Sequence, residues 1–256
     1  MGKQSWPQRL WLVRHGESAG NVARDAANAG GLSRIDISGR DVDVPLSERG
    51  SVQATALGRW FANLPAEERP EVILCSPYVR ARRTAEAISG EADLNAARVP
   101  IVIDERLREK EFGILDRLTH TGILEFHPEQ ARIRREVGKF YHRPPGGESW
   151  CDVILRMRST LHTLSLHYTG CRVLIVTHQV VVLCLRYLLE DMDEAGILEI
   201  DRAGDVANCA ITDYVFDESA GGAEGRMVLN RYNFTVPLQR EGAPVTSSPD
   251  MSPVPR

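Results

Sequence analysis

The chain has 256 residues, of which 43% are hydrophobic, and it carries a formal net charge of −4. This length and apolar content suffice to bury a full core. Acidic and basic residues are interspersed, which argues against a nucleic-acid groove or a membrane-binding surface. The longest apolar stretch, Val180 to Leu185, is far shorter than the about 20 residues that a membrane-spanning helix needs.

Cysteine usage and the N-terminal residues bear on the compartment. The five cysteines are odd in number and widely spaced, which favours reduced, buried thiols over a disulfide framework. The first residues, Met1 to Ser5, lack the apolar segment and cleavage site of a signal peptide. Together these features predict a cytoplasmic protein. No CxxC or HExxH spacing is present, so no metal site is expected.

Short runs of branched apolar residues alternate with segments of helical period along the chain. The predicted strands are Leu10–Val13, Val72–Cys75, Val99–Ile103 and Val173–Thr177. A helical stripe of apolar residues spaced four apart follows Ser47. A further predicted helix begins at Ser149, which resembles a capping box together with Asp152. Alternating strands and helices of this kind predict an α/β sandwich around a largely parallel sheet.

The last third of the chain adds a hairpin and a tail. The runs Ala210–Phe216 and Met227–Phe234 flank a glycine-rich turn, so we expect two antiparallel strands at one edge of the sheet. Residues 241–256 are rich in proline and serine without periodicity, which predicts a disordered tail. No internal repeat or linker interrupts residues 1–240, which we expect to form one domain. The predicted fold is a three-layer α/β/α sandwich with a mostly parallel central sheet and an antiparallel edge.

Histidines and arginines follow several of these strands. Arg14 and His15 end the first strand, Arg80 follows the second after a Ser-Pro turn, and His178 follows the fourth. Since ligands of open α/β sheets bind beyond the carboxyl ends of the strands, we expect these side chains to meet there. Phosphoryl transfer through a histidine needs a neutral imidazole, cations that hold the phosphoryl oxygens, and an acid that protonates the leaving oxygen. This sequence offers all three.

The motifs around these residues resemble those of the histidine phosphatase superfamily, which contains the cofactor-dependent phosphoglycerate mutases and related phosphatases. They occur in the family's order over roughly residues 9–190, with an Arg-His-Gly signature, a helix opening, a Ser-x-x-x-Arg-Ala-x-x-Thr-Ala pattern and a Gly-Glu-Ser element. In this chain they are Arg14–Asn21, Pro45–Gly50, Ser76–Ala85 and Pro145–Ser149. The resemblance implies a phosphoglycerate mutase-like fold and chemistry through a phosphohistidine.

The resemblance also implies roles for individual residues. His15 would be the nucleophile that becomes phosphohistidine. The residues that would hold the phosphoryl oxygens are Arg14, Arg80 and His178, with secondary contacts from Ser18, Asn21 and Gln179. Gln179 would act through its backbone N–H at a helix start rather than through its side chain. No cofactor and no metal is expected, because the guanidiniums and the second histidine supply the positive field.

Glu109 is the expected acid, and then the base that activates water. The family places this carboxylate four residues before a glycine, here Gly113, which favours Glu109 over Glu111. The alternative for Glu109 is a structural ion pair with Arg108.

Departures from the family pattern bear on the reaction. The family commonly has glycine after the second histidine, whereas Gln179 follows His178 here. His-Gln is similar to the bisphosphatase half of the bifunctional enzyme that handles fructose 2,6-bisphosphate. No Phe-Thr-Gly-Trp follows Asn21 and no Asn-Ser-Leu-Arg follows His178, as the mutases would have. We therefore predict a phosphatase of phosphomonoesters, with a phosphoglycerate mutase, a sugar bisphosphatase and a non-catalytic phosphate-binding protein as alternatives.

Two longer connections are expected to set the substrate. The segment Arg24–Val44 predicts either a substrate-facing rim or a plain surface excursion, and Gly113–Pro145 is a second, helical excursion. The second excursion carries a basic cluster made of Arg132, Arg134, Arg135 and Lys139. Such a run favours a solvated helix face, and the alternative is recruitment of an anionic substrate. The expected partner is a small phosphorylated molecule, not nucleic acid or membrane, and the sequence leaves the oligomeric state open.

Overall fold

A computed structural model describes residues 6–94, 98–221 and 224–247. The strands of this part are β1 (Arg9–Arg14), β2 (Val72–Cys75), β3 (Ile101–Ile103), β4 (Arg172–Thr177), β5 (Ile211–Asp217) and β6 (Arg226–Phe234). Its α-helices are α1 (Ala19–Ala29), α2 (Glu48–Ala62), α3 (Val79–Glu91), α4 (His120–Phe126), α5 (Pro128–Tyr141), α6 (Trp150–His167), α7 (Gln179–Leu189), α8 (Glu194–Ala203) and α9 (Val236–Arg240). None of the helices in these ranges has the length and hydropathy of a bilayer span.

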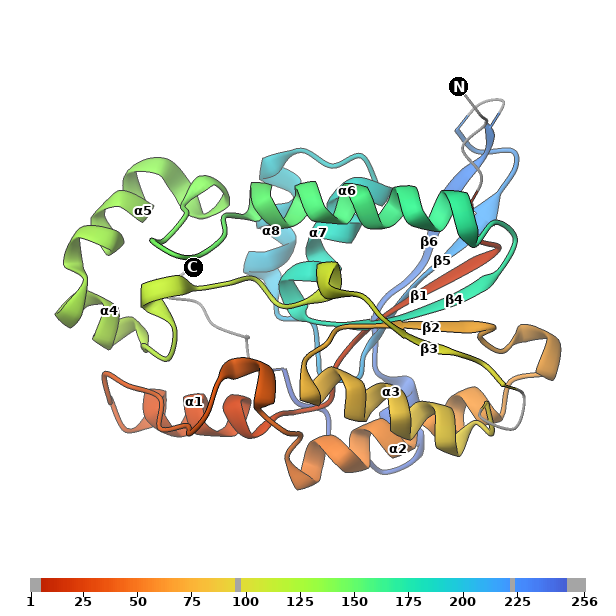
Figure 1. The fold of residues 1–256 in the computed structure, drawn as a ribbon, viewed down its shortest axis with the longest axis horizontal. Coiled ribbons are helices and arrows are strands. Elements are labelled where there is room, and N and C mark those ends of the chain that lie inside the picture. The colour runs from red at the N-terminus through yellow and green to blue at the C-terminus, as the bar shows by residue number, and fades with distance from the viewer. Residues whose placement is uncertain (1–5, 95–97, 222–223, 248–256) are drawn as a thin grey trace.

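The six strands form one sheet in the order β3-β2-β4-β1-β5-β6. The first four strands of this order are parallel, whereas β5 runs antiparallel to both β1 and β6. The predicted parallel sheet with an antiparallel hairpin edge is therefore confirmed. Helices α6, α7 and α8 cover one face of the sheet, and α2 and α3 cover the other (Figure 1). This arrangement confirms the three-layer α/β/α sandwich.

The central strand β1 shows how the sequence builds both layers. Leu10 and Leu12 pack into the apolar cluster beneath α6 and α7, and Trp11 and Val13 pack into the cluster beneath α2 and α3. Side chains alternate between the two faces of a strand, so an unbroken apolar run is what a strand covered on both faces requires. The predicted helix starts are also confirmed: Ser47 caps α2, and Ser149 forms a capping box with Asp152 at the start of α6.

Two long connections extend beyond the carboxyl ends of the parallel strands (Figure 1). We call residues 24–44 the first arm and residues 113–145, which include α4 and α5, the second arm. A β-bridge between Arg34 and Leu118 joins the arms, and the Ile35 N–H donates to the Arg117 carbonyl at 2.9 Å. Gly113 begins the second arm with φ of +56°, and a Cβ there would lie 2.1 Å from the Pro145 carbonyl oxygen. Only glycine fits this crossing.

The prediction of a disordered tail from residue 241 is wrong for residues 241–247. The Asn208 N–H donates to the Thr246 carbonyl at 2.8 Å, and the Gln53 amide donates to the Pro244 carbonyl at 2.9 Å. Composition misleads here because hydrogen bonds to the backbone need no apolar periodicity in the tail itself. Residues 248–256 lie outside the described residues.

Candidate active site

The residues predicted to hold the phosphoryl group converge at the carboxyl ends of three neighbouring strands. His15 follows β1, Arg80 lies in the first turn of α3 after β2, and His178 is the N-cap of α7 after β4. Since β2, β4 and β1 are parallel neighbours, their ends meet at one edge of the sheet. All three side chains are buried. The structure therefore brings these predicted residues together.

Hydrogen bonds at both ring nitrogens fix the orientation of His15. Its Nδ1 lies 2.7 Å from the Gly16 carbonyl oxygen, and the Arg80 Nε–H donates to its Nε2 at 3.2 Å. A carbonyl oxygen only accepts, so Nδ1 must carry the proton and Nε2 must keep its lone pair. The lone pair of Nε2, which accepts from Arg80 here, is the one that a neutral imidazole uses to attack phosphorus.

The loop that carries His15 is fixed from behind. The Thr84 hydroxyl accepts the Gly16 N–H at 3.0 Å, and the Asn208 amide donates to the His15 carbonyl at 3.0 Å. A Cβ on Gly16 would lie 2.5 Å from the Gly50 carbonyl oxygen, so the start of α2 packs directly against this turn. Asn208, which the sequence analysis missed, also holds Thr246 of the tail. The nucleophile is thus braced by segments far apart in sequence.

Arg80 and Arg14 are held by different groups. The Arg80 Nη1 donates to the Asp41 carboxylate at 3.0 Å and to the Asp41 carbonyl at 2.7 Å, while Nη2 reaches the same carboxylate at 3.1 Å. Asp41 belongs to the first arm, so this arm reaches the site instead of forming a plain surface excursion. The fully buried Arg14 donates from Nη1 to the Val206 carbonyl at 2.6 Å. No sequence signal marks Asp41.

His178 contacts both the nucleophile and a serine from β2. Its ring lies 5.0 Å from the His15 ring, edge to face. Its Nε2 lies 2.7 Å from the Ser76 hydroxyl oxygen, which fixes the imidazole plane. Ser76 was not assigned a role from sequence, although it opens the motif that contains Arg80. The Tyr78 ring lies 5.0 Å from His178 on another side.

Glu109 follows β3 on a loop and is 1% exposed. Its Oε1 accepts the Lys110 backbone N–H at 2.7 Å. The Thr177 hydroxyl donates to the Leu107 carbonyl at 2.8 Å, which ties this loop to the end of β4 beside His178. Glu111, the alternative acid, is half exposed and accepts from the Tyr78 hydroxyl at 3.1 Å. Of the two candidate acids, Glu109 is therefore the buried one.

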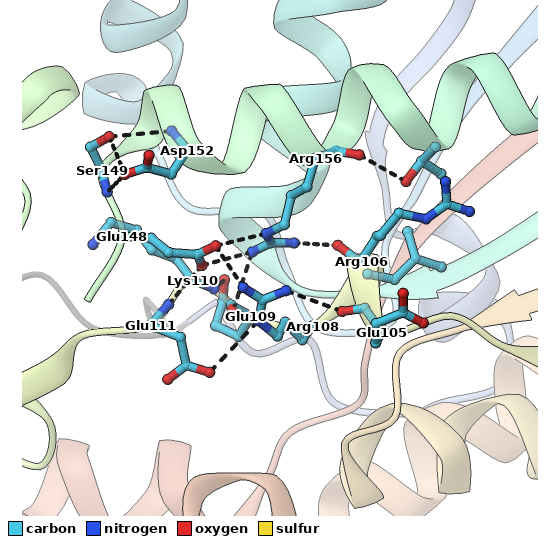
Figure 2. A network of polar contacts seen from close by, with 12 residues as sticks. Glu105, Arg106, Arg108, Glu109, Lys110, Glu111, Glu148, Ser149, Asp152 and Arg156 are labelled. Atoms are coloured by element: carbon cyan, nitrogen blue, oxygen red, sulfur yellow. Dashed lines mark hydrogen bonds and ion pairs between the residues drawn. The ribbon is translucent and has the colours of Figure 1, made fainter. Parts of the chain in front are cut away.

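The loop that carries Glu109 is held by the ion pair between Glu148 and Arg156 (Figure 2). The Arg156 Nε donates to the Glu148 carboxylate at 3.0 Å, and Arg156 also donates to the carbonyls of Arg106 and Glu109. Arg108 donates to the same Glu148 carboxylate at 2.8 Å. Among the described residues, Arg108 thus pairs with Glu148, within the Gly-Glu-Ser element, and not with Glu109 as in the alternative considered from sequence. This element is part of the family resemblance, but no role was predicted for it from the sequence.

The three secondary phosphate contacts have structural partners of their own. The Ser18 and Asn21 side chains form a capping box at the start of α1, and both line a cavity together with Arg80 and Asp41. The Gln179 side chain donates to the Asp205 carboxylate at 2.8 Å. Gln179 is the first residue of α7, so its backbone N–H lies at a helix N-terminus, where anions bind favourably.

The basic cluster of the second arm is divided by the fold. Arg132 and Arg135 are exposed, in agreement with the predicted solvated face, and Lys139 pairs with Asp201. Arg134, in contrast, is buried and faces Lys110, the neighbour of Glu109. Burial and the charge of Arg134 lower the pKa of Lys110 to about 8. The same helix therefore presents one arginine inward and two outward.

A family profile described as histidine phosphatase superfamily, branch 1, matches residues 10–226. The chain belongs to this superfamily. The match includes the strand ends that carry His15, Arg80 and His178, and also Glu109. The resemblance stated from the motifs is therefore confirmed.

Relatives within the superfamily differ in reaction. A 6-phosphofructo-2-kinase/fructose-2,6-bisphosphatase of Caenorhabditis elegans is 32% identical over 196 residues, which are 76% of this chain and 37% of that enzyme. A probable phosphoglycerate mutase of Photorhabdus laumondii is 34% identical over 69% of this chain and 72% of its own length. A mycobacterial glucosyl-3-phosphoglycerate phosphatase structure matches with a TM-score of 0.67 at 26% identity, over 89% of this chain and 99% of that chain. The chain thus spans little more than a third of the bifunctional relative.

Proposed function

We propose that this protein is a phosphatase that hydrolyses phosphomonoesters through a phosphohistidine at His15. The lone pair of Nε2 attacks phosphorus, and the bond between phosphorus and the ester oxygen breaks. Glu109 gives its proton to the leaving oxygen. The resulting carboxylate then takes a proton from water, whose oxygen attacks phosphorus and releases inorganic phosphate and His15. Arg14, Arg80 and His178 stabilise the charge on the phosphoryl oxygens.

One observation carries this proposal: the His15 Nε2 is held 3.2 Å from the Arg80 Nε, while its Nδ1 donates to the Gly16 carbonyl. The nucleophilic atom and a guanidinium are thus hydrogen-bonded to each other, and a phosphoryl group that displaces this hydrogen bond would contact both. A purely structural histidine would gain nothing from a buried cation at its acceptor nitrogen. The glucosyl-3-phosphoglycerate phosphatase among the solved structures supports a hydrolytic reaction.

A mutase and a sugar bisphosphatase are the competing activities, because relatives of both names match the chain. The mutase requires a second phosphoryl transfer to substrate in place of water. The motifs that accompany this transfer are missing after Asn21 and His178, so hydrolysis is favoured. Interconversion of the two monophosphoglycerates that depends on 2,3-bisphosphoglycerate, measured in a coupled assay, would overturn the assignment to hydrolysis.

The decisive variant is His15→Ala. We expect it to abolish hydrolysis of p-nitrophenyl phosphate, and we expect a Glu109→Ala protein to accumulate acid-labile phosphate on His15 from labelled substrate. His162→Ala, which removes an exposed histidine, serves as the matched control and keeps full activity. Full activity of His15→Ala would contradict the mechanism. Phosphate binding without hydrolysis by the wild-type protein at any pH from 5 to 8 would favour a binding protein instead.

A further inference from the structure

A glutamine of α2 holds the peptide group on which the orientation of the nucleophile depends. The His15 Nδ1 donates to the Gly16 carbonyl at 2.7 Å. The N–H of the same peptide group, that of Glu17, donates to the Gln53 side-chain oxygen at 2.8 Å. A peptide group that donates through its N–H becomes a better acceptor at its carbonyl, because linked hydrogen bonds polarise one another. Gln53 therefore supports the hydrogen bond that keeps the proton of His15 on Nδ1.

Asn208 holds the neighbouring part of the same turn. Its Nδ2 donates to the His15 carbonyl at 3.0 Å, and its side chain is fully buried, like that of Gln53. The N–H of the next residue, Cys209, donates to the Arg14 carbonyl at 3.0 Å. The peptide groups before and after the nucleophile are thus both held by the segment that leads into β5.

The two buried amides meet at one hydroxyl group, that of Thr246. The Gln53 Nε2 donates to the Thr246 Oγ1 at 2.8 Å, and the Thr246 hydroxyl donates to the Asn208 Oδ1 at 3.0 Å. The Gln53 Nε2 also donates to the Pro244 carbonyl at 2.9 Å. A hydroxyl has a single proton, so it can satisfy both amides only by accepting from one and donating to the other.

This network admits only one orientation of each amide. If the Gln53 amide turned by 180°, its NH₂ group would face the Glu17 N–H. If the Asn208 amide turned, its oxygen would face the His15 carbonyl. Either change leaves a buried donor or acceptor unsatisfied, which costs more than an ordinary hydrogen bond contributes. The Thr246 hydroxyl therefore selects the amide orientations that support the turn.

We propose that Gln53 and Asn208 are positioning residues for the nucleophile, and that Thr246 acts on His15 through them. Together they keep the Gly16 carbonyl directed at the Nδ1 proton, so that the lone pair stays on Nε2. Without this support the imidazole also adopts the tautomer with its proton on Nε2, which cannot attack phosphorus. This inference rests on the proposed phosphohistidine mechanism. A purely structural role of Thr246 would attach residues 241–247 to the domain and leave the tautomer unchanged.

Thr246→Val tests the proposal in the full chain, because valine has nearly the shape of threonine and lacks the hydroxyl. We expect kcat/KM for p-nitrophenyl phosphate to fall about three- to tenfold, as for one lost hydrogen bond. The inhibition constant of inorganic phosphate should stay at the wild-type value, because the groups that hold phosphoryl oxygens are unchanged. Thr246→Ser keeps the hydroxyl and should restore kcat/KM. Ser247→Ala removes an exposed hydroxyl one residue away and is the matched control.

Nitrogen-15 NMR of histidine-labelled protein reports the tautomer directly, because protonated and unprotonated ring nitrogens differ widely in chemical shift. The measurement is made at about pH 8, where ordinary imidazoles are neutral. The signals of His15 are those that disappear in His15→Ala, and in the wild type they should show the proton on Nδ1. Thr246→Val should show a second population with the proton on Nε2, and Thr246→Ser should not. Wild-type kcat/KM in Thr246→Val would overturn the proposal, and so would a fall in kcat/KM with Nδ1 fully protonated.

Asn208→Ala approaches the same network from its other amide. It should lower kcat/KM about tenfold, and adding Thr246→Val should lower it further by less than Thr246→Val does alone, because the two residues share hydrogen bonds. Independent, multiplying effects would contradict action through Asn208. Thermal unfolding shows whether each variant is folded, and the two Thr246 variants still decide the question if Asn208→Ala is not.

Turnover by the wild-type protein separates this inference from the function beneath it. A wild-type protein that does not hydrolyse p-nitrophenyl phosphate contradicts the phosphatase assignment, and the NMR comparison then still tests the control of the tautomer by Thr246. An active wild-type protein whose Thr246→Val variant has the same kcat/KM contradicts the positioning role alone.

Discussion

Buried positive charge is stabilised differently at the strand ends and around Lys110 and Arg134, which we call the base of the second arm. At the strand ends every basic group has a partner from the protein: Arg14 donates to the Val206 carbonyl, Arg80 to Asp41 and His15, and His178 contacts Ser76. At the base of the second arm, Lys110 and Arg134 are buried with no hydrogen bond or ion pair from their charged ends to the described residues. The first region is preorganised before substrate arrives. In the second region, burial and the charge of Arg134 lower the pKa of Lys110 to about 8.

This contrast distinguishes groups that act in the chemical step from groups whose burial affects stability. A preorganised clamp lowers the barrier for any phosphoryl group, because its charges need no rearrangement during the reaction. A buried cation without a hydrogen-bonded partner instead costs stability, because its desolvation is not offset. Perturbing the strand ends should therefore affect all substrates, and perturbing the arms should change selectivity or stability.

After loss of the nucleophile, the largest expected effect in the strand-end region comes from Glu109→Gln. Loss of the proton donor should reduce kcat by about 10²–10⁴-fold for glycerol 3-phosphate. The loss should be smaller for p-nitrophenyl phosphate, whose leaving oxygen needs little protonation. Steady-state kinetics with both substrates measures the difference. The matched control is Glu111→Gln, which changes a half-exposed carboxylate two residues away and should stay within about threefold of wild type. A larger loss in Glu111→Gln would reassign the acid.

The strand-end site could be predicted from sequence because its residues stand in short motifs attached to apolar runs. A buried strand that ends in Arg14-His15 places both side chains at the sheet edge whatever the remaining chain does. The capping box at the start of α6 could be predicted for the same reason, because Ser149 and Asp152 are only three residues apart. Local spacing and the parallel order of the strands were enough to bring His15, Arg80 and His178 together.

The contacts of the two arms could not be predicted from sequence, because they join residues that are far apart in the chain. In α5 the backbone of Gly138 has φ of +83°, so the helical period is interrupted and does not reveal that Arg134 points inward while Arg135 points outward. Asp41 lies in a segment without periodicity, yet it reaches Arg80 across 39 positions. The tail was misread because Thr246 is held by the side chains of Gln53 and Asn208, which composition does not reveal.

A pH-dependent loss of stability should mark the second arm. The folded state holds the pKa of His142 at about 4, below its ordinary value of 6.5, because burial, Arg134 and Lys110 disfavour the imidazolium. The unfolded chain therefore binds this proton first as the pH falls. Stability from His142 is fully present above pH 6.5 and is lost as the pH falls toward 4, by up to about 3 kcal/mol.

The comparison of wild type with His142→Asn isolates this contribution. Urea unfolding at pH 7, 6 and 5 should show a shallower decline of the free energy of unfolding in the variant, because all other titrating groups are shared. His162→Asn, at an exposed position, should keep the wild-type decline. Parallel curves for wild type and His142→Asn would show that the folded state does not lower the pKa of this imidazole.

The smallest effect is expected at the ion pair between Asp41 of the first arm and Arg80 at the strand ends. The Asp41 carboxylate accepts from both Nη atoms and so holds the guanidinium with its Nε–H directed at His15. Asp41→Asn leaves one acceptor oxygen and the backbone carbonyl in place, so we expect kcat/KM for p-nitrophenyl phosphate to fall only about three- to fivefold. Asp43→Asn removes a carboxylate two residues away that pairs with the exposed Arg40, and it should be neutral. A rise in kcat/KM for Asp41→Asn would reverse the interpretation, because Asp41 would then compete with the phosphoryl group for Arg80.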